Sequence, residues 1–453
     1  MEAAIAEDDE GKPDSGDEGA AGDAKERLTM VVLGHVDVGK STLMGQLLVK
    51  VGQVSQRVLQ KQEKEARGMG KASFYLAWVM DEDQEEREHG VTIDMAQKHF
   101  ETPSKRFTLL DAPGHRDFIP KMISGTSQAD VAVLVVPATT GEFESGFQSN
   151  GQTKEHSMLA KALGVNQILV AVNKLDAADP PWSVERFEAV KGKVLPFLMQ
   201  VGFKPNKVRF VPVSGLSGEN VAAREAGGQL AAWYDGPTLL EALDAFTAAP
   251  RQTSKPLRMC VVDVRPGGKG VAVSGRVLQG RVRTGNKVLV MPLGDLAMVT
   301  RIERNGATVE RARAGDNAEL TLSGVDAARV SVGCTLCKAK TPVPVARRFL
   351  AQVVTLDALE VPIIKGTEFQ MHTHGLDTMV HCSKLVARTM ATGQVIRSKP
   401  HCIPSGSAAH VRITSPRPLC LDTYATCRPL GRVVLRQRGA TVAVGQVLEI
   451  LPS

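Results

Sequence analysis

Short apolar runs recur along the first half of the chain and alternate with stretches of helical periodicity. The apolar runs are LTMVVLG (28–34), FTLLD (107–111), VAVLVV (131–136), ILVAVN (168–173) and VRFVPV (208–213). The helical stretches include 41–51, 153–163, 184–200 and 239–246. Strands that are apolar throughout and alternate with helices predict a mostly parallel sheet with helices on both faces.

The polar segment 55–90 interrupts this alternation. It is rich in Gln, Glu, Lys and Arg and predicts an exposed helix followed by a loop. A long insertion between a first helix and a second strand often carries function.

The pattern changes after AAPRQTSKP (248–256), which we interpret as a linker. Beyond it, short β-branched runs are separated by glycine turns such as PGGKG (266–270), and this predicts antiparallel β structure. A second proline-containing break, KAKTPVPVA (338–346), divides the β half. We therefore predict four segments: 1–26, 27–250, 251–340 and 341–453.

Composition places the chain among ordinary globular proteins, with 43% hydrophobic and 23% charged residues. No apolar run approaches the roughly 18 residues that cross a bilayer. The acidic N-terminus resembles neither a secretory signal nor a transit peptide, so we expect a cytoplasmic protein without membrane contact. The seven cysteines include one CxxC, Cys334 to Cys337, without a second pair at zinc-site spacing, and we interpret them as small buried hydrophobes.

The net charge of +6 conceals a strong asymmetry. Residues 1–26 carry 2 Lys/Arg and 10 Asp/Glu, a net −8, and residues 27–250 carry 24 and 26, a net −2. Residues 251–453 carry 29 and 13, a net +16. The first segment has too few large apolar side chains to fold and is predicted to be a disordered acidic tail. The basic half predicts a polyanionic partner, RNA above all.

A phosphate-binding motif follows the first apolar run. Residues 34–41 (GHVDVGKS) fit GxxxxGK[ST] directly after a strand and directly before a helix, the context that the motif requires. Its backbone N–H groups and the helix N-terminus would surround phosphate oxygens. Lys40 would bring its charge to the β- and γ-phosphates, and the Ser41 hydroxyl would ligate Mg²⁺.

The sequence Asn173-Lys174-Leu175-Asp176, at the end of another strand, selects the base. The Asp176 carboxylate can accept bonds from guanine N1–H and the exocyclic amine, whereas adenine would leave it unpaired. Asn173 can brace the phosphate loop, and the Lys174 stem can lie over the base. The backbone of Ser214, Gly215 and Leu216 can hold the guanine O6.

A third motif, Asp111-Ala112-Pro113-Gly114-His115, also follows a strand. Asp111 is expected to reach Mg²⁺ through water, and the Gly114 N–H to sense a γ-phosphate. His115 either orients the attacking water or is a loop histidine bonded to backbone. Thr92 could supply a second hydroxyl to Mg²⁺. Because parallel sheets bind ligands at the carboxyl ends of their strands, these motifs should converge on one GTP site.

With these motifs, residues 27–453 resemble the translational GTPases of the elongation factor Tu and elongation factor 1-alpha type. The resemblance rests on GHVDVGKST, DAPGHRDFI, NKLD and SGLSGEN. It implies an α/β P-loop GTPase domain, a mostly parallel sheet with helices on both faces, followed by two antiparallel β-barrel domains. It also implies ribosome-stimulated hydrolysis of GTP to GDP and phosphate, with His115 gated by Val36 and Val91. The implied nucleotide-binding residues are Gly34, His35, Val36, Asp37, Val38, Gly39, Lys40, Ser41, Thr42, Asp111, Gly114, Asn173, Lys174, Asp176, Ser214, Gly215 and Leu216, with Mg²⁺ held by Ser41, Thr92 and Asp111.

Within this superfamily three stretches look most like the Hbs-type GTPases: 203–234, 332–337 and 359–366. That resemblance implies a monomer that binds the ribosome and its rRNA and delivers a Pelota (Dom)-like tRNA-mimic protein to stalled ribosomes. Alternatives are an elongation factor that carries aminoacyl-tRNA and a GTPase partner of a release factor. A GTPase that activates a metabolic enzyme and a non-hydrolysing scaffold are further alternatives, and the basic half counts against the metabolic one.

Overall fold

The computed structural model describes residues 25–70, 74–80, 96–148, 151–267, 270–390 and 394–452. The predicted acidic tail therefore lies outside the described residues except for Lys25 and Glu26, and Glu26 is the first residue of β1. Within the described ranges, no helix is both long and apolar enough to cross a membrane.

The N-terminal domain is built on a six-stranded sheet of order β2-β3-β1-β4-β5-β6. All neighbours pair in parallel except β2, which runs antiparallel to β3 at the edge. The five predicted apolar runs are confirmed as strands, whereas β2 was not predicted, because Phe100 is its one buried residue and no apolar run marks it. The strands are β1 (Glu26–Leu33), β2 (Ala96–Glu101), β3 (Lys105–Asp111), β4 (Val131–Pro137), β5 (Ile168–Asn173) and β6 (Val208–Pro212).

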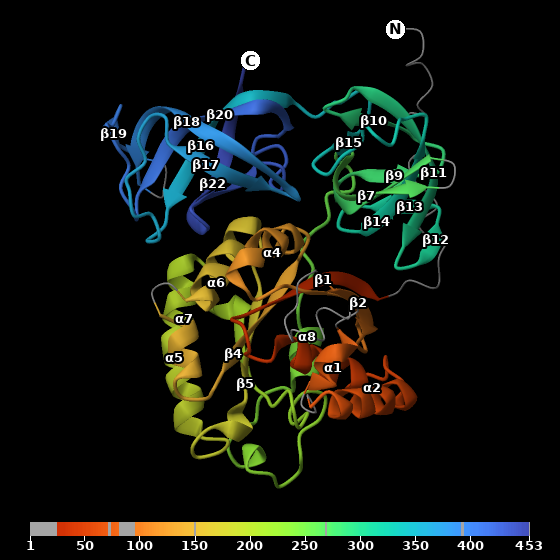
Figure 1. Ribbon diagram of the computed structural model, residues 1–453, viewed down its shortest axis with the longest axis vertical. Coiled ribbons are helices and arrows are strands. Elements are labelled where there is room, and N and C mark those ends of the chain that lie inside the picture. The colour runs from red at the N-terminus through yellow and green to blue at the C-terminus, as the bar shows by residue number, and fades with distance from the viewer. Residues whose placement is uncertain are drawn as a thin grey trace.

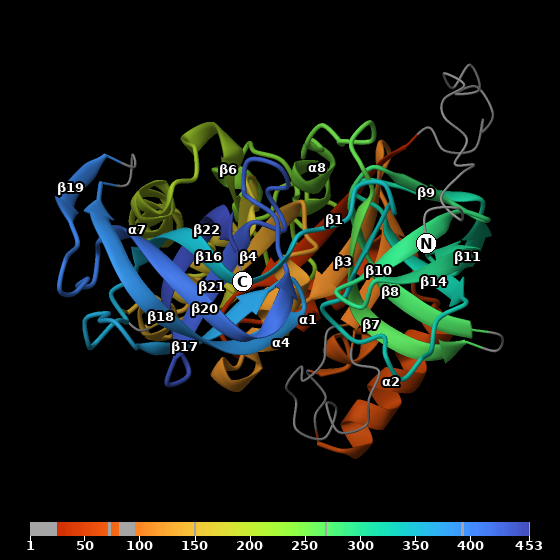
Figure 2. The same cartoon turned by 90° about the horizontal axis from the view of Figure 1, so that it is seen from above.

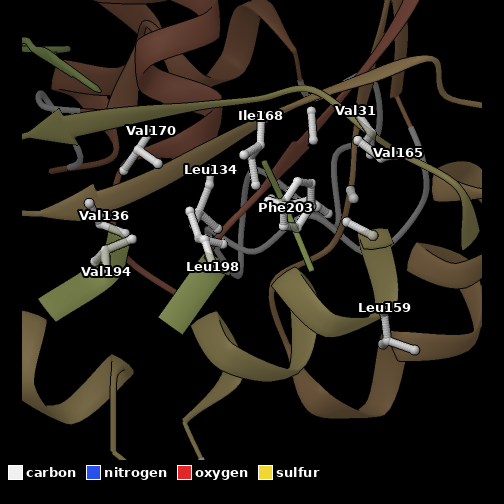
Figure 3. Close-up of a cluster of buried hydrophobic side chains, with 14 of the residues drawn as sticks. Val31, Leu134, Val136, Leu159, Val165, Ile168, Val170, Val194, Leu198 and Phe203 are labelled. Carbon is white, nitrogen blue, oxygen red and sulfur yellow. The ribbon is translucent and has the colours of Figure 1, made fainter. Parts of the chain in front are cut away.

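Helices cover both faces of this sheet, as predicted. On one face α1 and α8 pack against alternate residues of β1, β4 and β5, and on the other face α4, α6 and α7 pack against the remaining ones. Figure 3 shows the second cluster, in which Leu159, Val194 and Leu198 meet the sheet. The predicted polar helix is α2, in which Ala66 is the one buried residue. The helices are α1 (Lys40–Lys50), α2 (Gln56–Gly68), α4 (Ile119–Thr126), α5 (Glu142–Gly146), α6 (Gln152–Leu163), α7 (Val184–Val201) and α8 (Leu239–Asp244).

The rest of the described chain forms two closed antiparallel barrels, which confirms the predicted fold class. In the first barrel the ring β10-β15-β7-β8-β14-β11 is closed by β10 pairing with β11, and β12 extends β11. A separate two-stranded sheet joins β9 to β13. Its strands are β7 (Arg258–Gly267), β8 (Gly270–Gln279), β9 (Arg281–Arg283), β10 (Lys287–Met291), β11 (Asp295–Arg304), β12 (Ala307–Val309), β13 (Arg311–Arg313), β14 (Asn317–Ser323) and β15 (Thr335–Cys337).

In the second barrel the ring β17-β21-β22-β16-β20-β18 is closed by β17 pairing with β18, and β19 extends β18. The domain boundaries given above remain a prediction. The strands of this barrel are β16 (Val345–Thr355), β17 (Glu368–Thr373), β18 (Leu376–Thr389), β19 (Val395–Ser398), β20 (Ala408–Cys420), β21 (Arg432–Gln437) and β22 (Ala440–Leu451).

Both barrels lie on the same side of the N-terminal domain, the second over α4 and α6 and the first over the β1 and β2 edge (Figure 1). Seen from above, the two barrels stand next to each other (Figure 2). The second barrel contacts α6 through β21 and β22 and α4 through β17.

Candidate nucleotide-binding site

The predicted phosphate loop connects β1 to α1 and is held close to its neighbours. Gly39 has a φ of 84°, and a Cβ there would lie 2.8 Å from Asn173 Nδ2, so the position requires glycine. Lys40 begins α1, is 7% exposed and donates from Nζ to the His35 carbonyl at 2.9 Å. Burial lowers the pKa of Lys40, although the carboxylates of Asp111 and Asp37 oppose this shift. A buried ammonium at a helix N-terminus is well placed for an anion.

Two of the predicted magnesium ligands meet next to this lysine. Asp111 is the last residue of β3 and is fully buried, and its Oδ2 accepts a hydrogen bond from Ser41 Oγ at 2.7 Å. A hydroxyl and a carboxylate oxygen are donors that Mg²⁺ prefers, so the residues present fit that ion. The third predicted ligand, Thr92, and the gate residue Val91 lie outside the described residues.

Asn173, the last residue of β5, joins three loops. Its Nδ2 donates to the Val38 carbonyl at 2.9 Å, and its Oδ1 accepts from the Gly215 N–H at 2.8 Å. One side chain therefore holds the phosphate loop and the 214–216 loop in fixed positions relative to each other.

The remainder of the NKLD motif turns sharply after β5. Lys174 adopts a φ of 60°, and its Nζ pairs with Glu142 Oε2 at 2.8 Å, so its ammonium is engaged by α5. Asp176 follows in a short 3₁₀ turn, Leu175–Ala177. Among the described residues, no side chain or backbone group bonds to the Asp176 carboxylate, which lines the cavity described next.

These elements enclose one cavity of about 440 Å³. Most of the predicted site residues line it: Val36, Asp37, Gly39, Lys40, Ser41, Thr42, Gly114, His115, Asn173, Lys174, Asp176, Ser214, Gly215 and Leu216. Four predicted residues do not line it but contact the lining: Gly34, His35, Val38 and Asp111. Phe74, Ala77 and Ala177 also line the cavity and were missed, because their side chains lack the polar chemistry by which motifs are recognised.

His115 stands at the rim of this cavity with its side chain half-exposed. Its Nδ1 lies 3.4 Å from Asp117 Oδ2, and its ring centroid lies 6.0 Å from that of Phe118. The neighbouring Gly114 packs so closely on Lys40 that a Cβ there would collide with Nζ. The DAPGH loop therefore lies directly against Lys40.

A histidine that sequence reasoning missed lies behind the phosphate loop. His156 on α6 is fully buried, and its pKa is lowered to about 3, chiefly by burial and then by Lys40 and His35. It escaped notice because it occupies an apolar helix face outside any motif. At neutral pH it adds no second positive charge beside Lys40.

Comparison with protein families finds three models that match successive parts of the chain. The model of the elongation factor Tu GTP binding domain matches residues 25–249, that of elongation factor Tu domain 2 matches 270–337, and that of the GTP-eEF1A C-terminal domain matches 348–448.

Similar proteins extend across both barrels. Protein HBS1 of Drosophila melanogaster is 45% identical over 430 residues, 94% of this chain, and the chain spans 64% of the length of that protein. Elongation factor 1-alpha of Staphylothermus marinus is 41% identical over 94% of this chain and 97% of its own length. The GTP-bound Ski7 GTPase-like domain of S. cerevisiae has a TM-score of 0.76 at 19% identity, covering 93% of this chain and 97% of that chain, and so shares the fold.

Proposed function

Because the chain belongs to the elongation factor Tu and elongation factor 1-alpha family of translational GTPases, we propose that it is the GTP-switched factor of ribosome rescue that delivers a Pelota-like protein to stalled ribosomes. The observation that carries this proposal is the 45% identity to Drosophila protein HBS1 through all three domains. The match to elongation factor 1-alpha of S. marinus covers the same share of the chain at 41%.

The buried end of the cavity would take the phosphates of GTP. Lys40 would place its charge against the β- and γ-phosphates, while backbone N–H groups of residues 34–39 surround them. Ser41 Oγ and Asp111 Oδ2 are 2.7 Å apart. These two residues would hold Mg²⁺ together with Thr92. The ion, when bound, neutralises charge on the phosphate oxygens.

The other end of the cavity would take guanine. Asp176 would accept the two guanine N–H donors, a pairing that adenine cannot offer. The 214–216 backbone, which Asn173 holds in place, would bind the base oxygen. Since the Lys174 ammonium pairs with Glu142, its aliphatic stem is the part available to cover the base.

Hydrolysis would depend on His115. At the rim it can orient a water toward the γ-phosphate once the ribosome moves it inward, past a gate formed by Val36 and Val91. Gly114 and Thr92 would sense the γ-phosphate and order the adjacent segments, and the loss of phosphate would release the cargo. We expect slow hydrolysis of GTP to GDP and phosphate without the ribosome.

The net +16 of residues 251–453 supports contact with rRNA. We propose a cytoplasmic monomer whose cargo is a tRNA-shaped protein. Aminoacyl-tRNA and a release factor are the two alternative cargoes, because a factor carrying either would use the same nucleotide-site residues.

A capture experiment distinguishes these cargoes. Immobilised chain loaded with a non-hydrolysable GTP analogue or with GDP is incubated with purified Pelota, release factor and aminoacyl-tRNA in competition. We expect retention of Pelota with the GTP analogue only. Retention of aminoacyl-tRNA or release factor instead would overturn the proposed cargo. The Asp176→Asn variant is the matched control, because weaker GTP binding should abolish the nucleotide dependence.

A further inference from the structure

The short helix α5 contacts two of the loops that form the nucleotide site. Its first residue, Glu142, accepts a hydrogen bond at Oε2 from Lys174 Nζ at 2.8 Å. Its last residue, Gly146, packs so closely that a Cβ there would lie 3.4 Å from the Cβ of His35 in the phosphate loop. We call residues 138–146, which comprise the loop after β4 and α5, the α5 bracket.

The α5 bracket is fastened to α7 by one arginine. Arg186 donates from Nη1 to Glu144 Oε1 at 2.9 Å and from Nη2 to the Thr139 carbonyl at 3.1 Å. Its Nε donates to the Ala138 carbonyl. The bond from Arg186 is the main reason that the pKa of Glu144 is lowered to about 2. Phe143 is 2% exposed and belongs to the domain core. The bracket is therefore a fixed support beside the cavity.

The carboxylate of Glu142 is oriented by a second bond. Thr139 Oγ1 donates to the same Oε2 atom at 2.7 Å. Burial alone would raise the pKa of Glu142, but the bonds from Lys174 and Thr139 outweigh burial and lower the pKa. Glu142 is therefore charged at neutral pH. The Lys174 and Glu142 side chains are 29% and 51% exposed, so water weakens this ion pair only in part.

We propose that Glu142 is a positioning residue that holds the Lys174 ammonium, so that the aliphatic stem of Lys174 stays against the guanine base and slows the release of nucleotide. Holding a flexible side chain in its bound conformation before the ligand arrives removes part of the entropic cost of binding. This inference rests on the guanine site of the proposed function and is independent of the cargo.

The test measures how fast a fluorescent GDP analogue dissociates in stopped flow after excess GDP is added. Glu142→Gln keeps the shape of the side chain and removes its charge. We expect release to become about two- to fivefold faster, the range for a partly exposed ion pair, and the difference to shrink at high salt. Thr139→Val removes only the second bond to Glu142 and should give a smaller increase. Unchanged release in Glu142→Gln would overturn the proposal.

Two further measurements separate positioning from general support. Lys174→Met keeps an apolar stem without the ammonium, and in this background Glu142→Gln should have no further effect, because both groups act through one contact. An equal effect in both backgrounds would overturn the proposal. Inorganic pyrophosphate, which has no base, should displace the fluorescent GDP analogue from the phosphate loop with the same affinity in wild type and Glu142→Gln. Weakening of pyrophosphate and GDP alike would show that Glu142 supports the phosphate loop instead.

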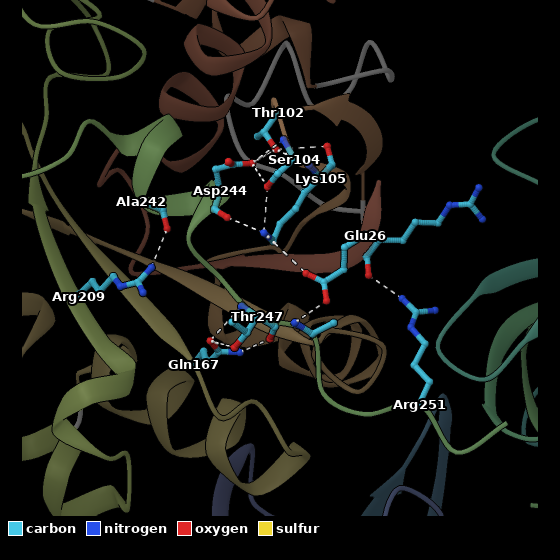
Figure 4. Close-up of polar contacts among 12 residues, drawn as sticks. Glu26, Thr102, Ser104, Lys105, Gln167, Arg209, Ala242, Asp244, Thr247 and Arg251 are labelled. Carbon is cyan, nitrogen blue, oxygen red and sulfur yellow. Dashed lines mark hydrogen bonds and ion pairs between the residues drawn. The ribbon is translucent and has the colours of Figure 1, made fainter. Parts of the chain in front are cut away.

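Two controls match the chemistry elsewhere in the domain. The Lys191–Glu188 pair on α7 is similarly exposed, at 39% and 54%, and Glu188→Gln should release GDP at the wild-type rate. Gln167 precedes β5 and bonds to Thr247, with Oε1 accepting from Thr247 Oγ1 at 3.0 Å (Figure 4). Gln167→Met loosens the start of the strand that leads to Lys174, and should also leave release unchanged. Faster release in Gln167→Met, equal to that in Glu142→Gln, would overturn a specific role of Glu142.

The same assay distinguishes failure of this inference from failure of the proposed function. Absence of GDP binding by the wild type, or equal displacement of the analogue by ADP, would overturn the guanine site itself and the inference with it. Normal, guanine-selective binding with unchanged release in Glu142→Gln would overturn the role of Glu142 alone.

Discussion

The N-terminal domain meets its two barrels in different ways. Against the second barrel, Val434 is 1% exposed and belongs to the same apolar cluster as the residues of α6 and α7, so this contact continues the domain core. Arg432 adds a bond to the Leu163 carbonyl at the end of α6 at 2.8 Å, and Glu155 accepts from Thr441 Oγ1 at 2.7 Å.

Against the first barrel, the contacts made by the described residues are polar and few. Arg276 pairs with Asp130, and Arg251 reaches the Arg27 carbonyl. Beside these tethers lies a cleft of about 560 Å³, lined by polar side chains such as His99, Gln128 and Glu319. The second barrel is thus joined to the N-terminal domain by apolar packing, whereas the first is joined by polar bonds that water can replace. A nucleotide-dependent rearrangement should therefore begin at the first barrel.

The largest effect should follow from Val434→Asp. The substitution buries an unpaired charge in the packed interface, and we expect the free energy of unfolding to fall by about 3–5 kcal/mol. Urea unfolding followed by fluorescence measures it. Val395→Asp is the matched control, because Val395 on β19 is 52% exposed and the change there should stay within about 0.5 kcal/mol. Equal losses in both variants would show that the second barrel is not packed as described.

A smaller effect should follow from Arg276→Gln at the first barrel. The Arg276 and Asp130 side chains are 11% and 17% exposed, and removing one charge of such a pair should cost about 1–3 kcal/mol. Arg265→Gln provides the control, because the Arg265–Asp263 pair is 70% and 42% exposed. In small-angle scattering we expect Arg276→Gln to have a larger radius of gyration than the wild type. The radius of gyration of Arg265→Gln should be the same as that of the wild type. An unchanged radius would contradict the idea that polar tethers position the first barrel.

The second barrel should also lose stability in acid, because of a histidine between β17 and β18. Burial, and then Arg432, lowers the pKa of His374 to about 4, against an ordinary value near 6.5. Between these values the unfolded chain binds the proton and the folded chain does not, so stability should fall as pH drops from 6.5 toward 4 and stay level above 6.5. His374 has a φ of 51°, which Asn tolerates. The difference in melting temperature between pH 7.5 and pH 5 should shrink by a few degrees in His374→Asn. An undiminished difference would exclude His374 as a source of the acid sensitivity.

The smallest effect should follow from Thr441→Val, which removes one hydrogen bond to Glu155 and leaves the packing. We expect a loss of about 1 kcal/mol, measured by the same urea titration. A loss as large as that of Val434→Asp would mean that polar bonds, rather than packing, dominate this interface.

The nucleotide site and the contacts between domains differ in how far the sequence predicts them. The nucleotide site could be anticipated because Asp111 and Asn173 each end an apolar strand, and the loop that leads to Lys40 follows a third apolar strand. The topology of a parallel sheet then brings the three residues together. Their roles in binding and hydrolysis remain predictions. The pairing of Lys174 with Glu142 could not be anticipated, because no local pattern links β5 to α5.

The contacts between the N-terminal domain and the two barrels could not be predicted from the sequence, for a related reason. Val434 looks like any inward-facing residue of a barrel strand, and nothing in its neighbours reveals that it contacts helices more than 200 positions earlier. The same holds for Arg276 and Asp130, whose charges are ordinary until the domains are placed together. The edge strand β2 was missed because alternate residues face solvent, so its apolar signal is weak.

The hydrogen bonds of Asn173 determine at which stage of synthesis the nucleotide site can form. This one amide joins Val38 to Gly215, positions that leave a synthesising ribosome far apart in time. A nascent chain that ends before residue 215 has the phosphate loop but cannot complete its bracing, because such long-range contacts form only after the later segment emerges. Nucleotide binding by a nascent chain would therefore show that the loop at Gly215 has been made, while the two barrels are still to be synthesised.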